Sequence, residues 1–136
     1  MGAWGHLAFD NDTANDWAYD LEEVDDLSSV ETAFAELEAV GADYLDQDVA
    51  CNALGACEVL ARLQGHAGYT NAYTKKVDQW VAAHKIKPPP ALLKRASAAI
   101  DRILAKNSEL RELWEETDDG DAWRKSVEDL RVRMRA

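Results

Sequence analysis

The residues best suited to chemistry lie close together near the start of the chain. His6, Asp10, Asp12 and Asp16 would supply one imidazole and three carboxylates. Clustered carboxylates are the ligands that divalent cations require, and a cation bound there would activate water for hydrolysis. A metal-assisted, hydrolase-like enzyme that uses this N-terminal Asp cluster is therefore one hypothesis for the function.

The leader, residues 1–12, also has a purely structural interpretation. Trp4 and Phe9 can fill a hydrophobic core, while the acids that follow cap a helix by accepting from its free N–H groups. We favour this interpretation, because buried aromatic residues and helix caps are both common. The candidate N-terminal site consists of Trp4, His6, Asp10, Asn11 and Asp12.

Known catalytic and metal-binding motifs are missing from the sequence. An EF-hand loop starting at Asp10 would need an oxygen ligand, Gly and Glu where the chain has Ala14, Asn15 and Leu21. The two cysteines and three histidines show no metal-site spacing. There is also no phosphate loop and no Gly-x-Ser-x-Gly. We therefore expect no catalytic residue, metal ion or cofactor.

An acidic series follows one face of the segment after the leader. Asp12, Asp16, Asp20 and Glu23 are spaced i, i+4, i+8 and i+11, and Glu22 lies beside them. Each like-charged neighbour costs an isolated helix about 0.2–0.5 kcal/mol. The helix dipole favours an acid at position 12 but opposes acids near the other end. We hypothesise that Asp16, Asp20, Glu22 and Glu23 bind a partner.

The charge of the chain is divided unevenly along its length. Residues 1–61 contain 15 Asp and Glu and no Lys or Arg, whereas residues 62–136 contain 11 acids and 15 bases. Since an acidic chain repels phosphate backbones, we expect no nucleic-acid partner. The expected partner is a basic protein. A homo-oligomer, in which the acidic half of one copy meets the basic half of another, is an alternative.

The sequence favours a cytoplasmic protein without a membrane segment. No apolar run approaches the roughly 18 residues that span a bilayer. The N-terminus lacks the basic and apolar regions of a signal peptide. Cys51 and Cys57 lie about 120° apart on a helix, too far to pair within it, so we expect reduced, buried thiols.

The periodicity predicts an all-α, single-domain helical bundle of about six to seven helices over residues 1–136. Residues 46–64 are apolar almost all round, which is typical of a buried central helix. A Pro-rich connector at residues 85–90 lies inside the domain, and its last proline can begin the next helix.

Local signals predict how individual helices begin, end and pair. Ser28 and Glu31 are spaced as a capping box, and Gly41 suits a left-handed helix end. Asp121 is expected to cap the last helix. Glu58 lies one turn before Arg62 on the central helix, which predicts a partly buried ion pair.

Two blocks of the sequence resemble a known family. Gly-Ala-Trp-Gly at residues 2–5, read with Phe-Asp-Asn-Asp-Thr-Ala-Asn-Asp-Trp at 9–17, resembles a bacterial family labelled domain of unknown function 4259. Residues 53–63 and 108–116, followed by Trp123, are similar to its second half. Leu7-Ala8 before Phe9 replaces a more usual glycine. The resemblance implies a bacterial, cytoplasmic helical protein and supplies no catalytic residues.

The sequence therefore leaves three functions open. The preferred one is a small acidic protein-binding module, immunity- or antitoxin-like, that engages a basic partner through its N-terminal half. The alternatives are the metal-assisted hydrolase and a homodimer-forming structural protein.

Overall fold

The computed structural model describes residues 5–135 of the chain, and their secondary structure consists of helices joined by short loops. The helices are α1 (Asp12–Glu22), α2 (Ser28–Val40), α3 (Gln47–Leu63), α4 (Lys75–Ala83), α5 (Pro90–Leu104), α6 (Glu109–Glu115) and α7 (Gly120–Arg133). The prediction of an all-α bundle of six to seven helices is confirmed.

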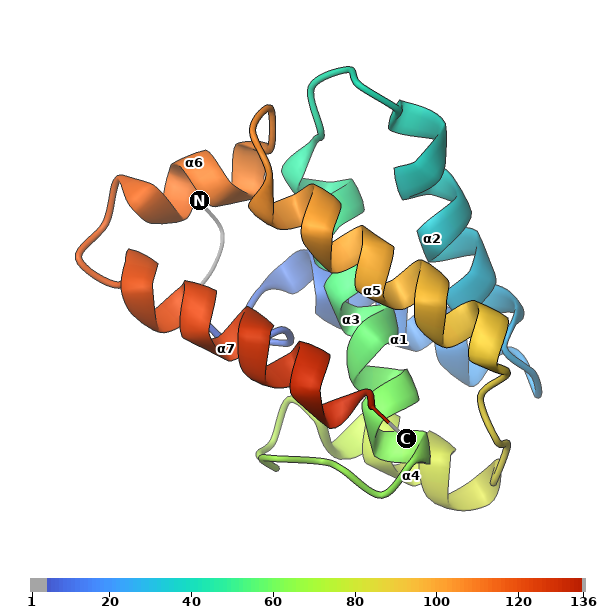
Figure 1. The fold of residues 1–136 in the computed structure, drawn as a ribbon. Helices are drawn as coiled ribbons and strands as arrows, with labels where there is room; N and C mark the ends of the chain where they lie inside the picture. The colour runs from blue at the N-terminus through green and yellow to red at the C-terminus, as the bar shows by residue number, and fades with distance from the viewer. Residues whose placement is uncertain (1–4, 136) are drawn as a thin grey trace.

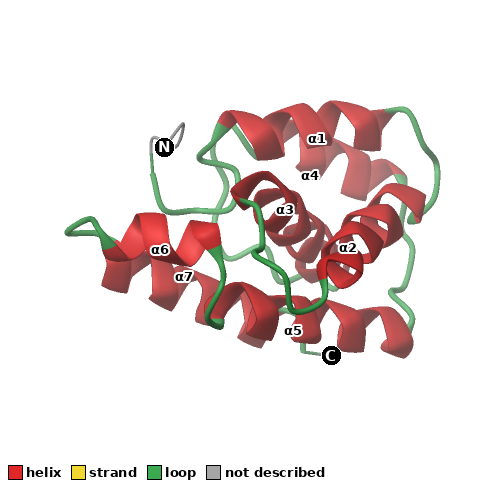
Figure 2. Ribbon diagram, turned by 90° about the horizontal axis from the view of Figure 1, so that it is seen from above, coloured by secondary structure: helices red, strands yellow, loops and turns green. Residues whose placement is uncertain are grey.

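The helices form three layers around α3 (Figures 1 and 2). Figure 2 shows α1 and α4 on one side, α2 and α3 in the middle, and α5, α6 and α7 on the other side. Twelve residues of α3 are buried, and α3 contacts each of the other described helices. The predicted central helix is therefore confirmed, with bounds one residue inside those expected at each end.

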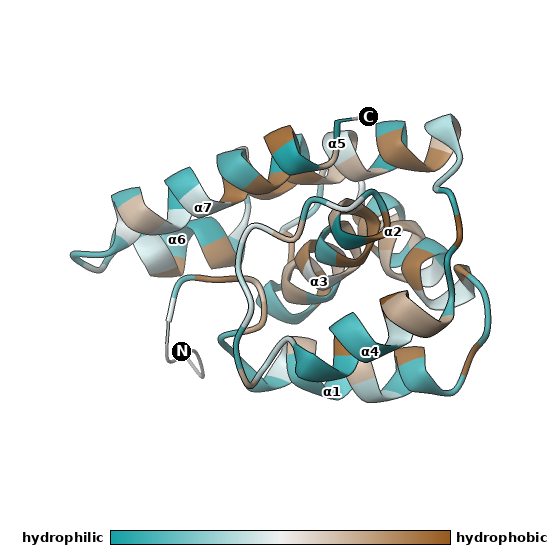
Figure 3. Cartoon of the chain, turned by 90° about the horizontal axis from the view of Figure 1, so that it is seen from below, coloured by the Kyte–Doolittle hydropathy of each residue, from teal (hydrophilic) through white to brown (hydrophobic). Residues whose placement is uncertain are grey.

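The outer helices turn apolar stripes toward α3 and polar faces outward (Figure 3). The thiols of Cys51 and Cys57 are free and buried, as expected. Across the described residues, none of the helices combines the length and the apolar character that crossing a bilayer requires.

Side-chain caps and one proline define the starts of three helices. Asn11 is the N-cap of α1, and its Oδ1 accepts from the N–H of Ala14 at 2.8 Å. Asp46 caps α3 by accepting from the N–H of Asp48 at 2.6 Å. Pro90 is the first residue of α5, where its missing N–H costs no hydrogen bond.

Three predicted features of helix ends are wrong. Ser28 is the first residue of α2 and not its N-cap; its own N–H is bound by Oδ1 of Asp26 at 3.0 Å, so no capping box forms. Asp121 lies inside the first turn of α7, after the N-cap Asp119. Gly41 does have a positive φ of 59°, but with ψ of −128° it is not a left-handed helical cap.

A short backbone bridge fixes where α6 lies. The N–H of Leu45 donates to the carbonyl of Asn107 at 2.8 Å, and the N–H of Glu109 donates to the carbonyl of Leu45 at 2.9 Å. Asn107 has a φ of 60°, in the left-handed region, and this residue turns the chain from the end of α5 toward α6. The start of α6 is thereby tied to the segment just before α3.

Candidate functional site

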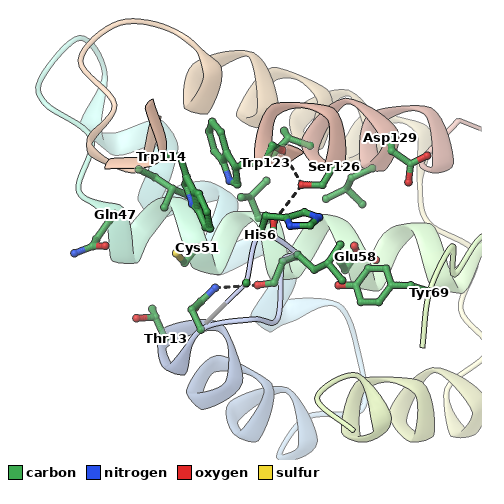
Figure 4. A pocket seen from close by; sticks show the side chains of 18 of the residues that line it. His6, Thr13, Gln47, Cys51, Glu58, Tyr69, Trp114, Trp123, Ser126 and Asp129 are labelled. Carbon is green, nitrogen blue, oxygen red and sulfur yellow. Dashed lines mark hydrogen bonds between the residues drawn. The ribbon is translucent and has the colours of Figure 1, made fainter. Parts of the chain in front are cut away.

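A pocket of about 390 Å³ opens where the leader, α3, α6 and α7 meet (Figure 4). We call it the leader pocket. Its volume falls within the range of small-molecule sites. Its polar and aromatic lining consists of His6, Asn11, Asp12, Thr13, Gln47, Asp48, Cys51, Glu58, Tyr69, Trp114, Trp123, Ser126, Asp129 and Arg133. Apolar side chains and Gly5 complete the walls.

Hydrogen bonds and one buried ring hold residues 5–12 of the leader in place as a wall of this pocket. Phe9 is fully buried. Its carbonyl accepts from Nδ2 of Asn15 at 2.7 Å. The carbonyl of His6 accepts from Oγ of Ser126 on α7 at 3.1 Å, one of the bonds drawn in Figure 4. The leader is thus attached to the core and to α7.

The predicted N-terminal site is divided by the structure. His6, Asn11 and Asp12 line the leader pocket. Asp10 is buried and accepts through Oδ2 from the N–H of Leu7 at 3.2 Å, so it stabilises the leader itself. Trp4 lies outside the described residues.

The carboxylates of the hydrolase hypothesis do not converge on one point. Asp10 faces the backbone of the leader, Asp12 lines the pocket, and Asp16 is exposed one turn further along α1. Within residues 5–135, no group of three or more His, Cys, Asp and Glu side chains is arranged to hold a metal ion.

Two indole rings form the wall of the pocket contributed by α6 and α7. Trp114 and Trp123 lie nearly parallel, with ring centroids 6.4 Å apart and an interplanar angle of 7°. They are only 5% and 3% exposed. Neither indole nitrogen is among the buried side-chain atoms that lack a hydrogen-bond partner in the described part of the chain.

A buried ionic cluster closes the opposite end of the pocket. Glu58 of α3 receives Nη1 and Nη2 of Arg133 at 2.9 and 2.8 Å, and Nε of its helix neighbour Arg62 at 3.3 Å. Arg62 also donates to Asp78 at 2.6 Å, and Arg133 to Asp129 at 2.8 Å. The predicted pair of Glu58 with Arg62 is confirmed, but Arg133 makes the bidentate contact.

Tyr69 lies against both guanidinium groups of this cluster. The guanidinium carbon of Arg62 is 4.9 Å from its ring centroid, and that of Arg133 is 5.8 Å away. Its hydroxyl oxygen is buried without a hydrogen-bond partner in the described part of the chain. Burial, with a contribution from the charge of Glu58, raises the pKa of Tyr69, so the phenol stays protonated at neutral pH.

The rim near α1 and α3 carries carboxylates without a counter-ion. Oδ1 of Asp48 accepts from the hydroxyl of Thr13 at 2.9 Å, and neither Asp48 nor Asp12 pairs with a cation from residues 5–135. Burial raises the pKa of the nearby Cys51 thiol to about 12, so this sulfur is not a ready nucleophile. The carboxylates of the rim are therefore unpaired, whereas each carboxylate at the far end contacts a guanidinium group.

Comparison with known protein families identifies the family of this chain. The model of a domain of unknown function, DUF4259, matches residues 2–126. The chain belongs to the DUF4259 family. No curated protein and no solved structure matches it. The match includes the leader, α3 and both indoles of the leader pocket, and it ends within α7, before Asp129 and Arg133 of the DUF4259 protein.

The predicted partner-binding residues lie on the outer surface of α1 in this DUF4259 protein. We call Asp16, Asp20, Glu22 and Glu23 the acidic face; all four side chains are exposed. Glu22 has a weak ion pair with Lys76 of α4 at 3.7 Å. The ammonium group of Lys76 also lies over the ring of Tyr19, 3.4 Å from the ring centroid. The remaining three acids form no ion pair with any residue that the structure describes.

Several pocket residues were not predicted as site residues. From the sequence, none of Trp114, Trp123, Asp48, Tyr69 and Arg133 was singled out for a site. A usable signal was the pair of tryptophans on either side of the turn Asp118-Asp119-Gly120, because a short turn brings neighbouring helices together. The contact of Arg133 with Glu58, across 75 positions, has no local signal.

Proposed function

We propose that this DUF4259 protein is a protein-binding module that engages a basic partner through the acidic face of α1. Such a module would neutralise its partner in the manner of an immunity protein or an antitoxin. The proposal includes a bacterial setting, which the family resemblance implies, and a cytoplasmic location, which the resemblance and the sequence both favour.

One observation carries the proposal: three of the four acids of the acidic face have no basic partner within residues 5–135. Asp16, Asp20 and Glu23 are exposed and lack ion pairs there, and only Glu22 lies near a cation, Lys76. The arginines of the basic half are used elsewhere. They bind Glu58, Glu38, Asp101 and Glu115, and Arg102 binds backbone carbonyls.

An exposed field of one sign favours a protein of the opposite sign. It raises the rate of encounter and selects against acidic proteins, and salt weakens both effects. The three unpaired acids repel one another in the free protein, so a basic partner would also relieve that repulsion. These are the physical reasons for choosing a basic partner over an apolar one.

The geometry gives the hydrolase hypothesis less support. A pocket does lie beside His6 and Asp12, but Asp10 is occupied by the leader backbone.

The homodimer alternative predicts an ion pair between the acidic face and the basic half of a second copy. A monomeric mass in light scattering at low salt would contradict the homodimer alternative.

The test is affinity capture of soluble proteins from the source cells with three forms of the chain. These are the wild type, the face variant Asp16→Asn/Asp20→Asn/Glu23→Gln, and a control, Asp118→Asn/Asp119→Asn/Asp121→Asn, with the same charge change around the α6–α7 turn. We expect the wild type and the control to retain a basic protein at low salt and to release it at high salt. The face variant should lose it. Equal capture by all three forms, or by none, overturns the proposal.

A further inference from the structure

The acidic series of α1 begins inside the leader pocket. Asp12 lines the pocket, and Asp16 and Asp20 follow it at i+4 and i+8 on α1. Residues with this spacing lie on one face of a helix. The acidic face and the pocket rim are therefore parts of one continuous acidic surface, and a chain bound along α1 passes the mouth of the pocket.

The unneutralised charge of the pocket is concentrated at that mouth. Four carboxylates and one guanidinium line the pocket. Glu58 and Asp129 both pair with the guanidinium, Arg133, whereas Asp12 and Asp48 have no cation among the described residues. Each helix N-terminus there contributes only about +0.5 of a charge. Two full carboxylates therefore leave the mouth negative, and an anionic ligand is excluded.

The inner wall of the pocket can contact the aliphatic part of a residue that carries a cationic group. Trp114 and Trp123 offer ring surface, which attracts organic cations and covers aliphatic chains. These side chains are more than nine-tenths buried, so only a small part of each ring system faces the cavity.

We infer that the leader pocket receives a lysine or arginine side chain of the basic partner, with its cationic head at Asp12 and Asp48. Its aliphatic stem lies against Trp114 and Trp123. A cavity of about 390 Å³ holds one such side chain with its adjacent peptide groups. The inference rests on the proposed function, because it supplies the specific contact that the acidic face alone does not provide.

The test uses four small probes on the full chain at low salt: the N-acetyl methylamides of lysine, arginine, norleucine and glutamate. Norleucine keeps the stem of lysine without its charge. Binding is followed by calorimetry and by tryptophan fluorescence, because two indoles line the pocket. We expect the lysine and arginine probes to bind at least about tenfold more tightly than norleucine, and glutamate not to bind.

Two variants locate the binding. Asp12→Asn/Asp48→Asn should abolish the preference for the cationic probes, with the thermal midpoint showing that the variant is folded. Trp123→Phe should reduce the fluorescence change while the control Asp118→Asn/Asp119→Asn leaves it unchanged. Equal affinity for lysine and norleucine, no binding of either cationic probe, or a preference that survives in Asp12→Asn/Asp48→Asn overturns the inference.

The same variants separate this inference from the proposed function. The face variant Asp16→Asn/Asp20→Asn/Glu23→Gln should lose the captured protein but retain binding of the lysine probe. The pocket variant Asp12→Asn/Asp48→Asn should lose both. If the face variant loses capture and the pocket variant captures normally, the proposed function stands and the pocket inference fails. If neither variant loses capture, the proposed function fails, and the probe titration decides the pocket's affinity for cations by itself.

Discussion

Glu58 and Arg133 form a two-pronged ion pair that joins the middle of α3 to the end of α7. Nη1 of Arg133 lies 2.9 Å from Oε1 of Glu58, and Nη2 lies 2.8 Å from Oε2. The Glu58 side chain is 2% exposed and that of Arg133 is 11% exposed. Arg133 also donates to the carbonyls of His66 and Ala67, so this contact fixes the loop after α3 and closes one end of the leader pocket.

Replacing Glu58 by Gln should strongly destabilise the protein, because it leaves two buried guanidinium groups without their shared carboxylate. We expect a loss of about 3–5 kcal/mol in the free energy of unfolding, measured by urea denaturation. The control is Glu128→Gln, whose exposed carboxylate lies 3.3 Å from Nε of Arg131 on α7, and it should cost no more than about 1 kcal/mol. Equal losses in the two variants would contradict this account.

Substitution of two glycines by alanine distinguishes the cost of backbone strain from the cost of displacing Arg133. Gly65 and Gly68 both have positive φ, at 84° and 72°. A Cβ on Gly65 meets nothing within 4 Å, whereas one on Gly68 would lie 2.6 Å from Cδ of Arg133. Gly65→Ala should therefore cost about 1 kcal/mol from strain alone, and Gly68→Ala clearly more. The thermal midpoints of unfolding test this prediction, and Gly68→Ala should have the lower midpoint. A lower midpoint for Gly65→Ala would show that Arg133 can move without cost.

His84 should make stability depend on pH. Its Nδ1 lies 2.9 Å from the carbonyl of Trp80, and its Nε2 lies 3.0 Å from Oδ1 of Asp25. The carbonyl contact first, and then Asp25, raise the pKa of His84 above its ordinary value of 6.5. The folded state thus favours the protonated ring. This contribution is fully present below the unfolded pKa and is lost as pH rises through the folded pKa.

The measurement for His84 is the urea midpoint of unfolding as a function of pH on either side of 6.5. His84→Gln should remove the decline that the wild type shows across this interval, and Asp25→Asn should reduce it. A wild-type and a His84→Gln curve that remain parallel would contradict the assignment.

The two thiols should be protected in the folded protein. Cys57 is fully buried and Cys51 is 6% exposed, and burial raises the pKa of both thiols, that of Cys51 to about 12. An aromatic disulfide reagent at about pH 8 should label neither thiol in native buffer and both in urea. Rapid labelling of the native protein would show that the leader pocket opens far enough to expose Cys51.

Features with a local physical cause could be predicted from the sequence. The burial of α3 follows from its apolar residues on all sides, the start of α5 from Pro90, and the pair of Glu58 with Arg62 from their i, i+4 spacing. Phe9 and Asn11 also have their expected structural roles.

Features that depend on competition or on distant contacts could not be predicted. The capping box at Ser28 failed because the nearby Asp26 binds the N–H of Ser28. Arg133 reaches Glu58, and Trp114 meets Trp123, only when the helices pack. The leader pocket therefore required the structure, although its acidic rim at Asp12 belongs to the series visible in the sequence.

The most direct test of the central claim is a titration of the isotopically labelled chain with an octalysine peptide, followed by amide chemical shifts at low salt. Binding through the acidic face predicts that the largest shifts lie in α1, from Asp12 to Glu23, and extend to the rim of the leader pocket at Asp48. The shifts at residues 16–23 should disappear in Asp16→Asn/Asp20→Asn/Glu23→Gln, whereas those at the rim of the leader pocket should remain. Shifts of similar size around Asp118, Asp119 and Asp121, or no shifts at all, would contradict the claim that α1 is the binding face.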